Sequence, residues 1–195
     1  MDAAADAHLR ETCIASERVY HGHLLEVRRD RVRLPGGGEA AREYIVHPGA
    51  VVIVPLLDDG RLVMERQFRY PLGRVLLEFP AGKIDAGEDP FVTGVRELAE
   101  ETGYRAAEWA HAATIHNAVG YSDERIEVWF ARGLRPGTAA LDEGEQLEVL
   151  LVEPAALDAM CARGEVTDVK TLVGLLWLQR WRAGHWPLRW QPAPV

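Results

Sequence analysis

Hydrophobic residues along this chain alternate with polar ones or cluster in short runs, and these patterns predict a structure rich in strands. Residues 50–57 read AVVIVPLL, a continuous apolar run typical of a strand buried on both faces. Asp58-Asp59-Gly60 follows as a hairpin turn signal, so residues 61–69 are expected to form the partner strand. The same criteria predict further strands at residues 17–20, 24–34, 42–47, 75–79, 111–117, 126–131 and 146–152.

Three segments carry helical patterns. In the clearest one, Asp89 is a candidate N-cap, Pro90 occupies the first helical position, and Gly103 stands where a left-handed residue ends a helix. An apolar stripe along this helix is expected to pack on a sheet and consists of Val92, Val95, Leu98 and Ala99. Two later helices are predicted at residues 154–163 and 169–181, the second with core candidates at Leu172, Leu175, Leu176 and Leu178.

These elements predict an α/β fold in which helices cover both sides of a mixed sheet. Residues 1–47 are β-rich and are expected to form a small sheet of their own, while residues 48–195 form the main domain. The length of 195 residues suits one domain with a small extension, and a hydrophobic content of 48% is enough for a substantial core.

The charge and the cysteines narrow the classes of function. A net charge of −8 disfavours nucleic-acid binding, because general polyanion binders present a basic surface. Neither of the two cysteines, Cys13 and Cys161, lies in a metal-ligand spacing. No apolar run approaches the roughly 20 residues of a membrane span, and the N-terminus lacks the features of a secretory signal. A cytoplasmic location without membrane attachment is therefore expected.

The most informative feature is a cluster of acids near the end of the first helix. Glu97, Glu100 and Glu101 are three or four residues apart and share a helix face, where like charges repel. Arg96 can pair with Glu100 four residues on. Gly82 in the preceding loop allows a backbone carbonyl to approach a metal ion. Hard carboxylate oxygens suit Mg²⁺ or Mn²⁺, whereas the alternative interpretation is a solvated acidic helix face.

The wider segment fits the pattern G-x5-E-x7-R-E-U-x-E-E-x-G-U, where U is a bulky apolar residue. Nine positions match, namely Gly82, Glu88, Arg96, Glu97, Leu98, Glu100, Glu101, Gly103 and Tyr104. This segment resembles the Nudix box. The resemblance implies an α/β/α sandwich and a Mg²⁺-dependent hydrolase that cuts a pyrophosphate bond. It also implies that Arg96 orients the acids, that Glu88 assists through water, and that the metal is held by the Ala81 carbonyl with Glu97, Glu100 and Glu101.

A second acidic segment supplies candidates for the general base. Residues 141–145 read LDEGE and directly precede the strand predicted at residues 146–152, although an ordinary acidic turn is the alternative interpretation. ADP-ribose pyrophosphatases of the Nudix family carry a similar loop before a similar strand. By that resemblance Glu143 is the first candidate and Glu145 the second, with Glu88 and the glutamates of the box as competitors.

The resemblance to the ADP-ribose pyrophosphatase branch covers about residues 17–182. It implies substrate contacts from Arg42-Glu43, Arg69 and Glu78, of which the arginines match phosphate oxygens and Glu78 can accept from ribose or adenine. Surface ion pairs are the alternative interpretation of these residues. The branch also implies a homodimer that exchanges the N-terminal sheet, and Tyr20 is the candidate that stacks on adenine. The implied products are AMP and a sugar phosphate.

One departure leaves the substrate open. Val119 stands where this branch commonly has a proline, so GDP-mannose and other nucleoside diphosphate sugars remain alternatives to ADP-ribose. A domain that binds ADP-ribose without cleaving it, and an inactive dimer module, are two further alternatives. Such a sensor is expected to have lost carboxylates of the box, whereas this chain has all of them.

Overall fold

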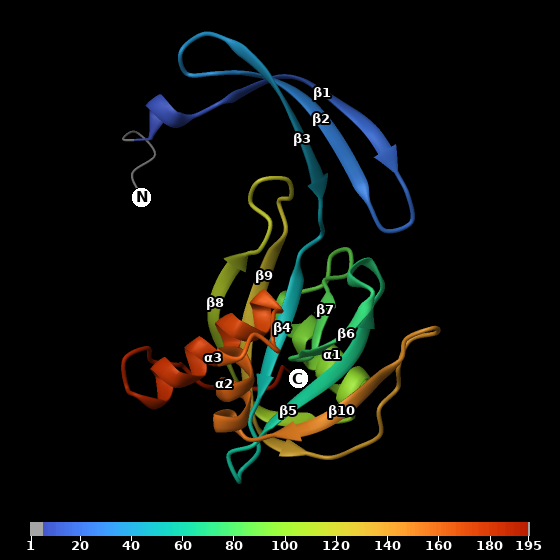
Figure 1. Ribbon diagram of the computed structural model, residues 1–195, viewed down its shortest axis with the longest axis vertical. Coiled ribbons are helices and arrows are strands. Elements are labelled where there is room, and N and C mark those ends of the chain that lie inside the picture. Colours follow the sequence, from blue (N-terminus) through green and yellow to red (C-terminus); the bar gives the residue numbers. More distant parts are fainter. Residues whose placement is uncertain (1–5, 195) are drawn as a thin grey trace. The chain divides into compact units, whose positions relative to one another are not determined.

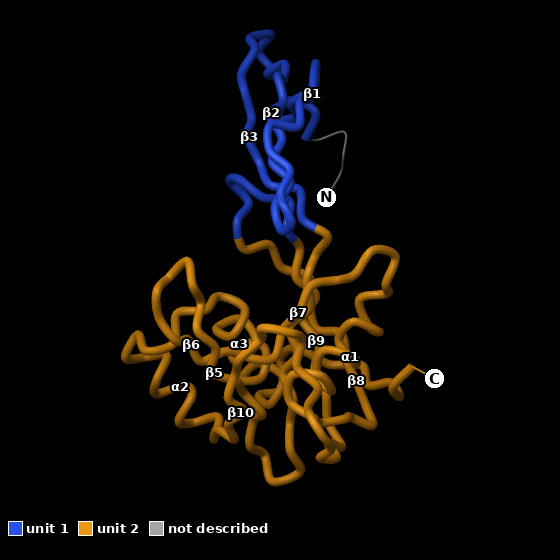
Figure 2. Tube along the Cα trace, turned by 90° about the vertical axis from the view of Figure 1, so that its right-hand side faces the viewer, with its two compact units in different colours: residues 1–47, 118–124 blue, residues 48–117, 125–195 orange. Residues whose placement is uncertain are grey.

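The computed structural model describes residues 6–194, which form two compact units (Figure 2). The first unit contains the chain up to His47 together with Ala118–Glu124, and the second contains Pro48–Asn117 and Arg125–Val195. The inclusion of Ala118–Glu124 in the first unit was not expected, because the sequence analysis assigned everything after residue 47 to one domain. Backbone hydrogen bonds explain it, since Ile45 donates its N–H to the Tyr121 carbonyl at 2.8 Å.

The first unit is a three-stranded antiparallel sheet. A short 3₁₀ helix, η1 (Ala7–Leu9), precedes β1 (Thr12–His21), β2 (Glu26–Arg33) and β3 (Glu39–Val46), which lie in the order β1-β2-β3. Most of their side chains are exposed, and Val32 is the buried hydrophobic residue of these strands. A small sheet needs a hydrophobic face or a packed helix for independent stability, and these three strands bury little apolar surface of their own.

A five-stranded mixed sheet forms the centre of the second unit (Figure 1). Its order is β11 (Gln191–Pro192), β8 (Arg105–His116), β9 (Arg125–Arg135), β4 (Ala50–Pro55) and β7 (Ala81–Lys83). The pair β4–β9 is parallel and the other pairs are antiparallel. The short strands β7 and β11 were not predicted, because three and two residues are too few for a periodic pattern to appear.

A second sheet of the same unit has the order β10-β5-β6. It consists of β10 (Leu147–Val152), β5 (Leu62–Arg69) and β6 (Arg74–Glu78), with the 3₁₀ helix η2 (Tyr70–Leu72) between the last two. Both pairs are antiparallel. The central strand β5 is therefore bonded on both sides, which fixes the direction of each of its side chains.

Helices cover both faces of the central sheet. Val52 and Val54 of β4 pack in one core with residues of α2 (Pro154–Ala162) and α3 (Val169–Arg182). Val51 and Ile53 point the other way, into a core with α1 (Pro90–Thr102). This alternation explains why the strand is apolar throughout and confirms the predicted α/β/α sandwich. Among residues 6–194, no helix combines the length and hydropathy that crossing a bilayer requires.

The buried face of α1 differs from the predicted stripe. Val92 is 44% exposed, whereas Thr93 and Gly94 are buried. A Cβ built on Gly94 would lie 3.6 Å from the Trp109 ring, so the helix contacts the sheet closely at this small residue. The contact turns the buried face toward Gly94, Leu98 and Glu101, and the prediction for Val92 is wrong.

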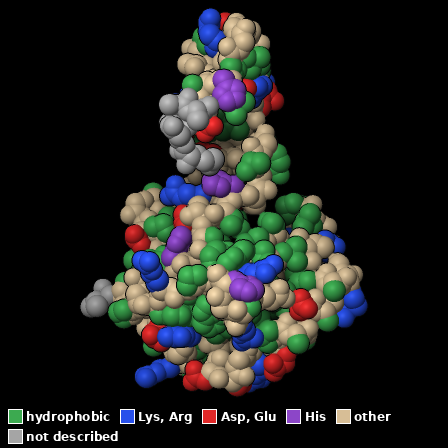
Figure 3. All heavy atoms as spheres, turned by 90° about the vertical axis from the view of Figure 1, so that its left-hand side faces the viewer, with side chains coloured by type: hydrophobic (Ala, Val, Ile, Leu, Met, Phe, Trp, Pro, Cys, Tyr) green, Lys and Arg blue, Asp and Glu red, His purple; other side chains and the backbone are tan. Residues whose placement is uncertain are grey.

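The apolar residues of α3 are likewise divided between the core and the surface. Leu175 and Leu178 are buried as predicted, but Leu172 and Leu176 are exposed. The four leucines cover more of the helix circumference than one sheet can cover. Hydrophobic side chains also gather at the surface of this unit in Figure 3, with charged groups of both signs around them.

Candidate active site

Helix α1 presents the predicted acids from a well-anchored position. Asp89 caps it by accepting a hydrogen bond from the Phe91 N–H at 2.8 Å, and Gly103 is its C-cap, both as predicted. The Phe91 ring stacks on Trp129 with 4.5 Å between centroids, which fixes the first turn against β9. The acids of the last two turns are therefore carried on a helix held at both ends.

Arg96 is the centre of an ion-pair network. Its Nη1 donates to Glu97 Oε1 and to Glu100 Oε2, both at 2.9 Å, so the pair expected from the i, i+4 spacing is present. Its Nε and Nη2 donate to the two oxygens of Glu88 at 3.1 and 3.0 Å. The guanidinium, together with a hydrogen bond from Thr93, lowers the pKa of Glu88 to about 2. Glu88 is thus held as a carboxylate that fixes Arg96.

Glu97 lies directly against the backbone of Gly82. A Cβ built on Gly82 would come within 1.9 Å of Glu97 Cδ, so a glycine is required there for this side-chain position. Burial is the main cause that raises the pKa of Glu97 to about 7, and repulsion from Glu100 and Glu145 adds to it. The close approach of β7 to α1 therefore places a partly desolvated carboxylate beside the loop that carries Ala81.

Glu101 and Glu65 form a buried pair that was not predicted as a pair. Glu101 is 3% exposed, and its Oε2 accepts a hydrogen bond from the Ala81 N–H at 3.0 Å. Glu65 of β5 is 0% exposed, and neither of its carboxylate oxygens has a hydrogen-bond partner in the described chain. Burial is the largest cause that raises the pKa of both groups, and each faces further carboxylates, Glu101 facing Glu65.

Sequence reasoning missed Glu65, although one signal was available. Leu62, Val63 and Met64 are buried without alternation, and Glu65 continues that buried run. A glutamate that extends an apolar run is unusual, because a buried carboxylate is costly without a counter-charge. Its approach to Glu101 depends on the tertiary structure, which brings together residues 36 positions apart, and no local pattern contains it.

The donor set fits a hard divalent cation. Several carboxylates and the backbone around Ala81 lie here, and both oxygens of Glu65 are buried without a hydrogen-bond partner among the described residues. Burial first, and repulsion between these carboxylates second, raise the pKa of Glu97 and Glu101. Within residues 6–194, however, no three His, Cys, Asp or Glu side chains are gathered around one point closely enough to hold a metal ion. Arg96 accounts for part of this, since it draws Glu97 and Glu100 to itself.

The two candidates for the general base differ in position. Glu145 is partly buried, accepts a hydrogen bond from Gln67 Nε2 at 3.4 Å, and lies near enough to raise the pKa of Glu97 and Glu101. Glu143 is exposed in a turn, and the structure records no hydrogen bond or ion pair of its side chain with residues 6–194. The geometry thus favours the second choice of the sequence analysis over the first.

Two predicted substrate residues of the second unit bind each other. Arg69 Nε and Nη2 donate to the two oxygens of Glu78 at 2.8 and 2.9 Å. Glu78 is 1% exposed and also pairs with Lys170 of α3, which in turn contacts Asp168. Both oxygens of Glu78 are therefore engaged, and this carboxylate orients Arg69 rather than standing free for a ribose or an adenine. Sequence reasoning did not include Lys170, which comes from a distant helix.

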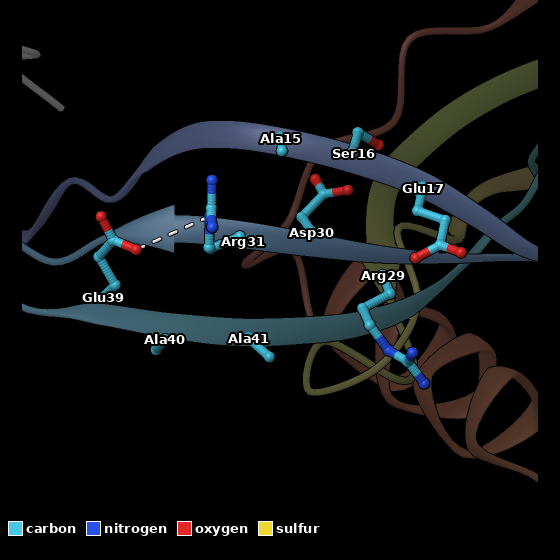
Figure 4. Close-up of a pocket in the computed structure, with 9 residues that line it drawn as sticks. All are labelled: Ala15, Ser16, Glu17, Arg29, Asp30, Arg31, Glu39, Ala40 and Ala41. Carbon is cyan, nitrogen blue, oxygen red and sulfur yellow. Dashed lines mark ion pairs between the residues drawn. The ribbon is translucent and has the colours of Figure 1, made fainter.

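The other predicted substrate residues lie in the first unit. Arg42 on β3 pairs with Glu11, Glu43 pairs with Arg29 at 2.8 Å, and Tyr20 on β1 is 56% exposed. The sheet also carries an open hollow of about 590 Å³ (Figure 4). Its lining combines small side chains with charged ones, and none of the three predicted residues belongs to it; the lining residues are Ala15, Ser16, Glu17, Arg29, Asp30, Arg31, Glu39, Ala40 and Ala41.

Comparisons with known proteins cover both units. Residues 46–173 match the NUDIX domain, and residues 11–45 match the nucleoside diphosphate sugar hydrolase N-terminal domain. An ADP-ribose pyrophosphatase of Bacillus subtilis is 37% identical over 173 residues, which cover 88% of this chain and 94% of that protein. An ADP-ribose pyrophosphatase of Mycobacterium tuberculosis is 39% identical over 168 residues, with coverages of 84% and 80%.

A solved structure agrees with these matches. The crystal structure of an ADP compounds hydrolase superposes with a TM-score of 0.80 at 25% identity and covers 90% of this chain and 95% of its own. Residues 46–173, which match the NUDIX domain, include α1 with its acids and Gly82, the glycine that Glu97 contacts closely. The chain therefore belongs to the Nudix hydrolase family.

Proposed function

We propose that this protein hydrolyses the pyrophosphate bond of ADP-ribose, or of a related nucleoside diphosphate sugar, and releases AMP and a sugar phosphate. The observation that carries the proposal is the pair of buried carboxylates, Glu65 and Glu101, which face each other without an ion pair in the described part of the chain and suit a divalent cation. The names of the two similar ADP-ribose pyrophosphatases support this substrate class.

The metal is Mg²⁺ or Mn²⁺, held by Glu97, Glu100 and Glu101 with the carbonyl of Ala81. When bound, such a cation neutralises the diphosphate and lowers the pKa of a water molecule that attacks phosphorus. The protein contributes the positions of the donors. Gly82 leaves room for the Glu97 carboxylate, and Arg96 holds α1 to the loop through Glu88.

Glu145 accepts the proton of the attacking water. Its proximity to Glu97 and Glu101 supports this role, whereas Glu143 is exposed and keeps the role of alternative base. General-base catalysis typically contributes about 10²- to 10⁴-fold, so its loss leaves a slow but measurable enzyme. The two residues differ by only two positions in one turn, which makes them a matched pair for mutation.

Substrate contacts are proposed for residues of each unit taken separately. Arg69 is held by Glu78 with its guanidinium partly exposed, so it is preorganised for a phosphate oxygen. In the first unit Arg42 and Glu43 are engaged with Glu11 and Arg29, and these ion pairs exchange for substrate contacts on binding, with Tyr20 stacking on the base.

The first experiment measures AMP release from ADP-ribose with and without Mg²⁺, beside GDP-mannose and ADP-glucose. Metal-dependent turnover of ADP-ribose is expected, together with its loss in Glu97→Gln. A Glu145→Gln variant is expected to lose about 10²-fold or more in kcat, with Glu143→Gln within a few fold of wild type. The proposal is contradicted if no substrate is hydrolysed or if Glu97→Gln is fully active. If only GDP-mannose is hydrolysed, the hydrolase proposal stands and the substrate is GDP-mannose instead of ADP-ribose.

The protein acts as a homodimer in this proposal. The exposed sheet β1–β3, which carries Tyr20 and Val19 at its surface, supports a contact with a second copy. Light scattering of the purified protein is expected to give about twice the mass of the 21.7 kDa chain. A monomer mass at micromolar concentration contradicts the dimer and leaves the hydrolase proposal standing.

A further inference from the structure

The charges around α1 do not balance, and the imbalance is local. Arg96 forms ion pairs with the carboxylates of Glu88, Glu97 and Glu100. The remaining buried acids of the neighbourhood are Glu65, Glu78 and Glu101, and the cations near them are Arg69 and Lys170.

Those cations are already engaged elsewhere. Arg69 forms two hydrogen bonds to Glu78, and Lys170 forms an ion pair with the same carboxylate and with Asp168. Glu78 lies opposite Glu65 in the β5–β6 ladder, so this cluster lies next to Glu65 without giving it an ion pair. Among residues 6–194, no ion pair includes Glu65 or Glu101.

The two unpaired carboxylates lie against each other. The charge of Glu65 acts on Glu101, and each carboxylate is among the neighbours that influence the other. One oxygen of Glu101 accepts a hydrogen bond from the Ala81 N–H, whereas both oxygens of Glu65 are buried without a hydrogen-bond partner in the described chain. A buried anion without a counter-charge costs several kcal/mol, and a neutral side chain would fill the same space at lower cost. In its ionised form, a carboxylate at this position therefore requires a positive ligand.

We propose that a divalent cation binds between the carboxylates of Glu65 and Glu101, so that Glu65 is a metal ligand supplied by β5. The inference rests on the proposed metal dependence and adds a residue that lies outside the Nudix box. A charge of +2 matches the two unpaired carboxylates, and oxygen donors select Mg²⁺ or Mn²⁺. The central position of β5 between β6 and β10 fixes the side chain in place for this role.

The test is a titration of the substrate-free protein with Mn²⁺, in which free Mn²⁺ is followed by electron paramagnetic resonance. Glu65→Gln keeps the shape of the side chain and removes its charge. The matched control is Glu148→Gln on the adjacent strand β10. The Glu148 side chain is 69% exposed and pairs with Arg66. We expect Glu65→Gln to bind Mn²⁺ at least about tenfold more weakly or with one ion fewer, and Glu148→Gln to match wild type.

Wild-type affinity and stoichiometry in folded Glu65→Gln overturns the inference. If circular dichroism shows that this variant does not fold, an anomalous difference map from wild-type crystals grown with Mn²⁺ tests instead whether Glu65 is a metal ligand. A peak within about 2.5 Å of a Glu65 carboxylate oxygen supports the assignment, and peaks that all lie beyond 4 Å refute it.

A third variant separates this inference from the proposed function. Glu97→Gln tests the acids of the box in the same Mn²⁺ titration. Loss of Mn²⁺ binding in Glu97→Gln with full binding in Glu65→Gln removes only the role of Glu65. No binding by the wild-type protein removes both the metal-dependent function and this site.

Discussion

Gly82→Ala is expected to remove catalysis while leaving the fold nearly intact. The added Cβ would lie 1.9 Å from Glu97 Cδ and 2.0 Å from its Oε1. To regain ordinary contact at 3.4 Å, the carboxylate has to move by about 1.5 Å, since 3.4 − 1.9 = 1.5. The atoms in conflict are at the far end of a flexible side chain, so the side chain rather than the backbone yields.

The cost in stability is small because its contributions are small and partly offset one another. A displaced rotamer of Glu97 costs about 0.5–1.5 kcal/mol, and losing the partly exposed ion pair with Arg96 costs about 0–1 kcal/mol. Replacing glycine by alanine at a compatible backbone position returns about 0.4–1 kcal/mol through the unfolded chain. The net destabilisation is therefore about 0–2 kcal/mol, or a few degrees in Tm for a chain of this size.

The cost in activity is larger because a ligand of the proposed cation is displaced. A misplacement of about 1 Å can cost about 100-fold in rate, which corresponds to about 2.7 kcal/mol of transition-state stabilisation. The assay is metal-dependent AMP release, measured beside a thermal melt of the same preparation. We expect kcat/KM to fall at least about 100-fold while Tm changes by only a few degrees.

Gly164→Ala is the matched control. Gly164 follows α2 with φ of 72°, and a Cβ there would meet nothing within 4 Å. Left-handed strain is expected to cost about 1–2 kcal/mol of stability with kcat/KM unchanged. The reasoning is refuted if Gly82→Ala keeps wild-type kcat/KM. It is also refuted if the loss of activity is no larger than the loss of folded protein that the thermal melt shows.

Two further predictions concern residues that support the site. The pKa of Glu88 is lowered to about 2 in the folded protein, so its ion pair with Arg96 stabilises the fold fully above about pH 4.5 and is lost as the pH falls toward 2. Urea unfolding should therefore show a stability gap between wild type and Glu88→Gln at pH 6 that closes between pH 4.5 and 2, and a constant gap would contradict this. Thr171 Oγ1 donates to Asp168 at 2.7 Å and accepts the buried Phe79 N–H at 3.0 Å. Thr171→Val is expected to lower the free energy of unfolding by about 1–3 kcal/mol, and an unchanged urea midpoint would show that this N–H finds another partner.

The sequence by itself determined the local features. The helix of the box could be predicted with both caps, because Asp89, Pro90 and Gly103 act within one turn of their own positions. The pair Arg96–Glu100 follows from helical spacing, and the apolar run of β4 follows from burial on two faces. Such features require only neighbouring residues, so a local pattern contains them.

The tertiary structure decided which distant residues meet. Glu65 of β5 and Glu101 of α1 are brought together only in the folded chain, and Lys170 reaches Glu78 from a helix 92 residues further along the chain. The proposal of Glu145 over Glu143 depends on the partly buried position of Glu145, whose charge acts on Glu97 and Glu101. The exposure of Val92 depends on how closely Gly94 lets the helix approach the sheet. Burial and charge compensation are set by these long-range contacts, and periodicity along the chain carries no information about them.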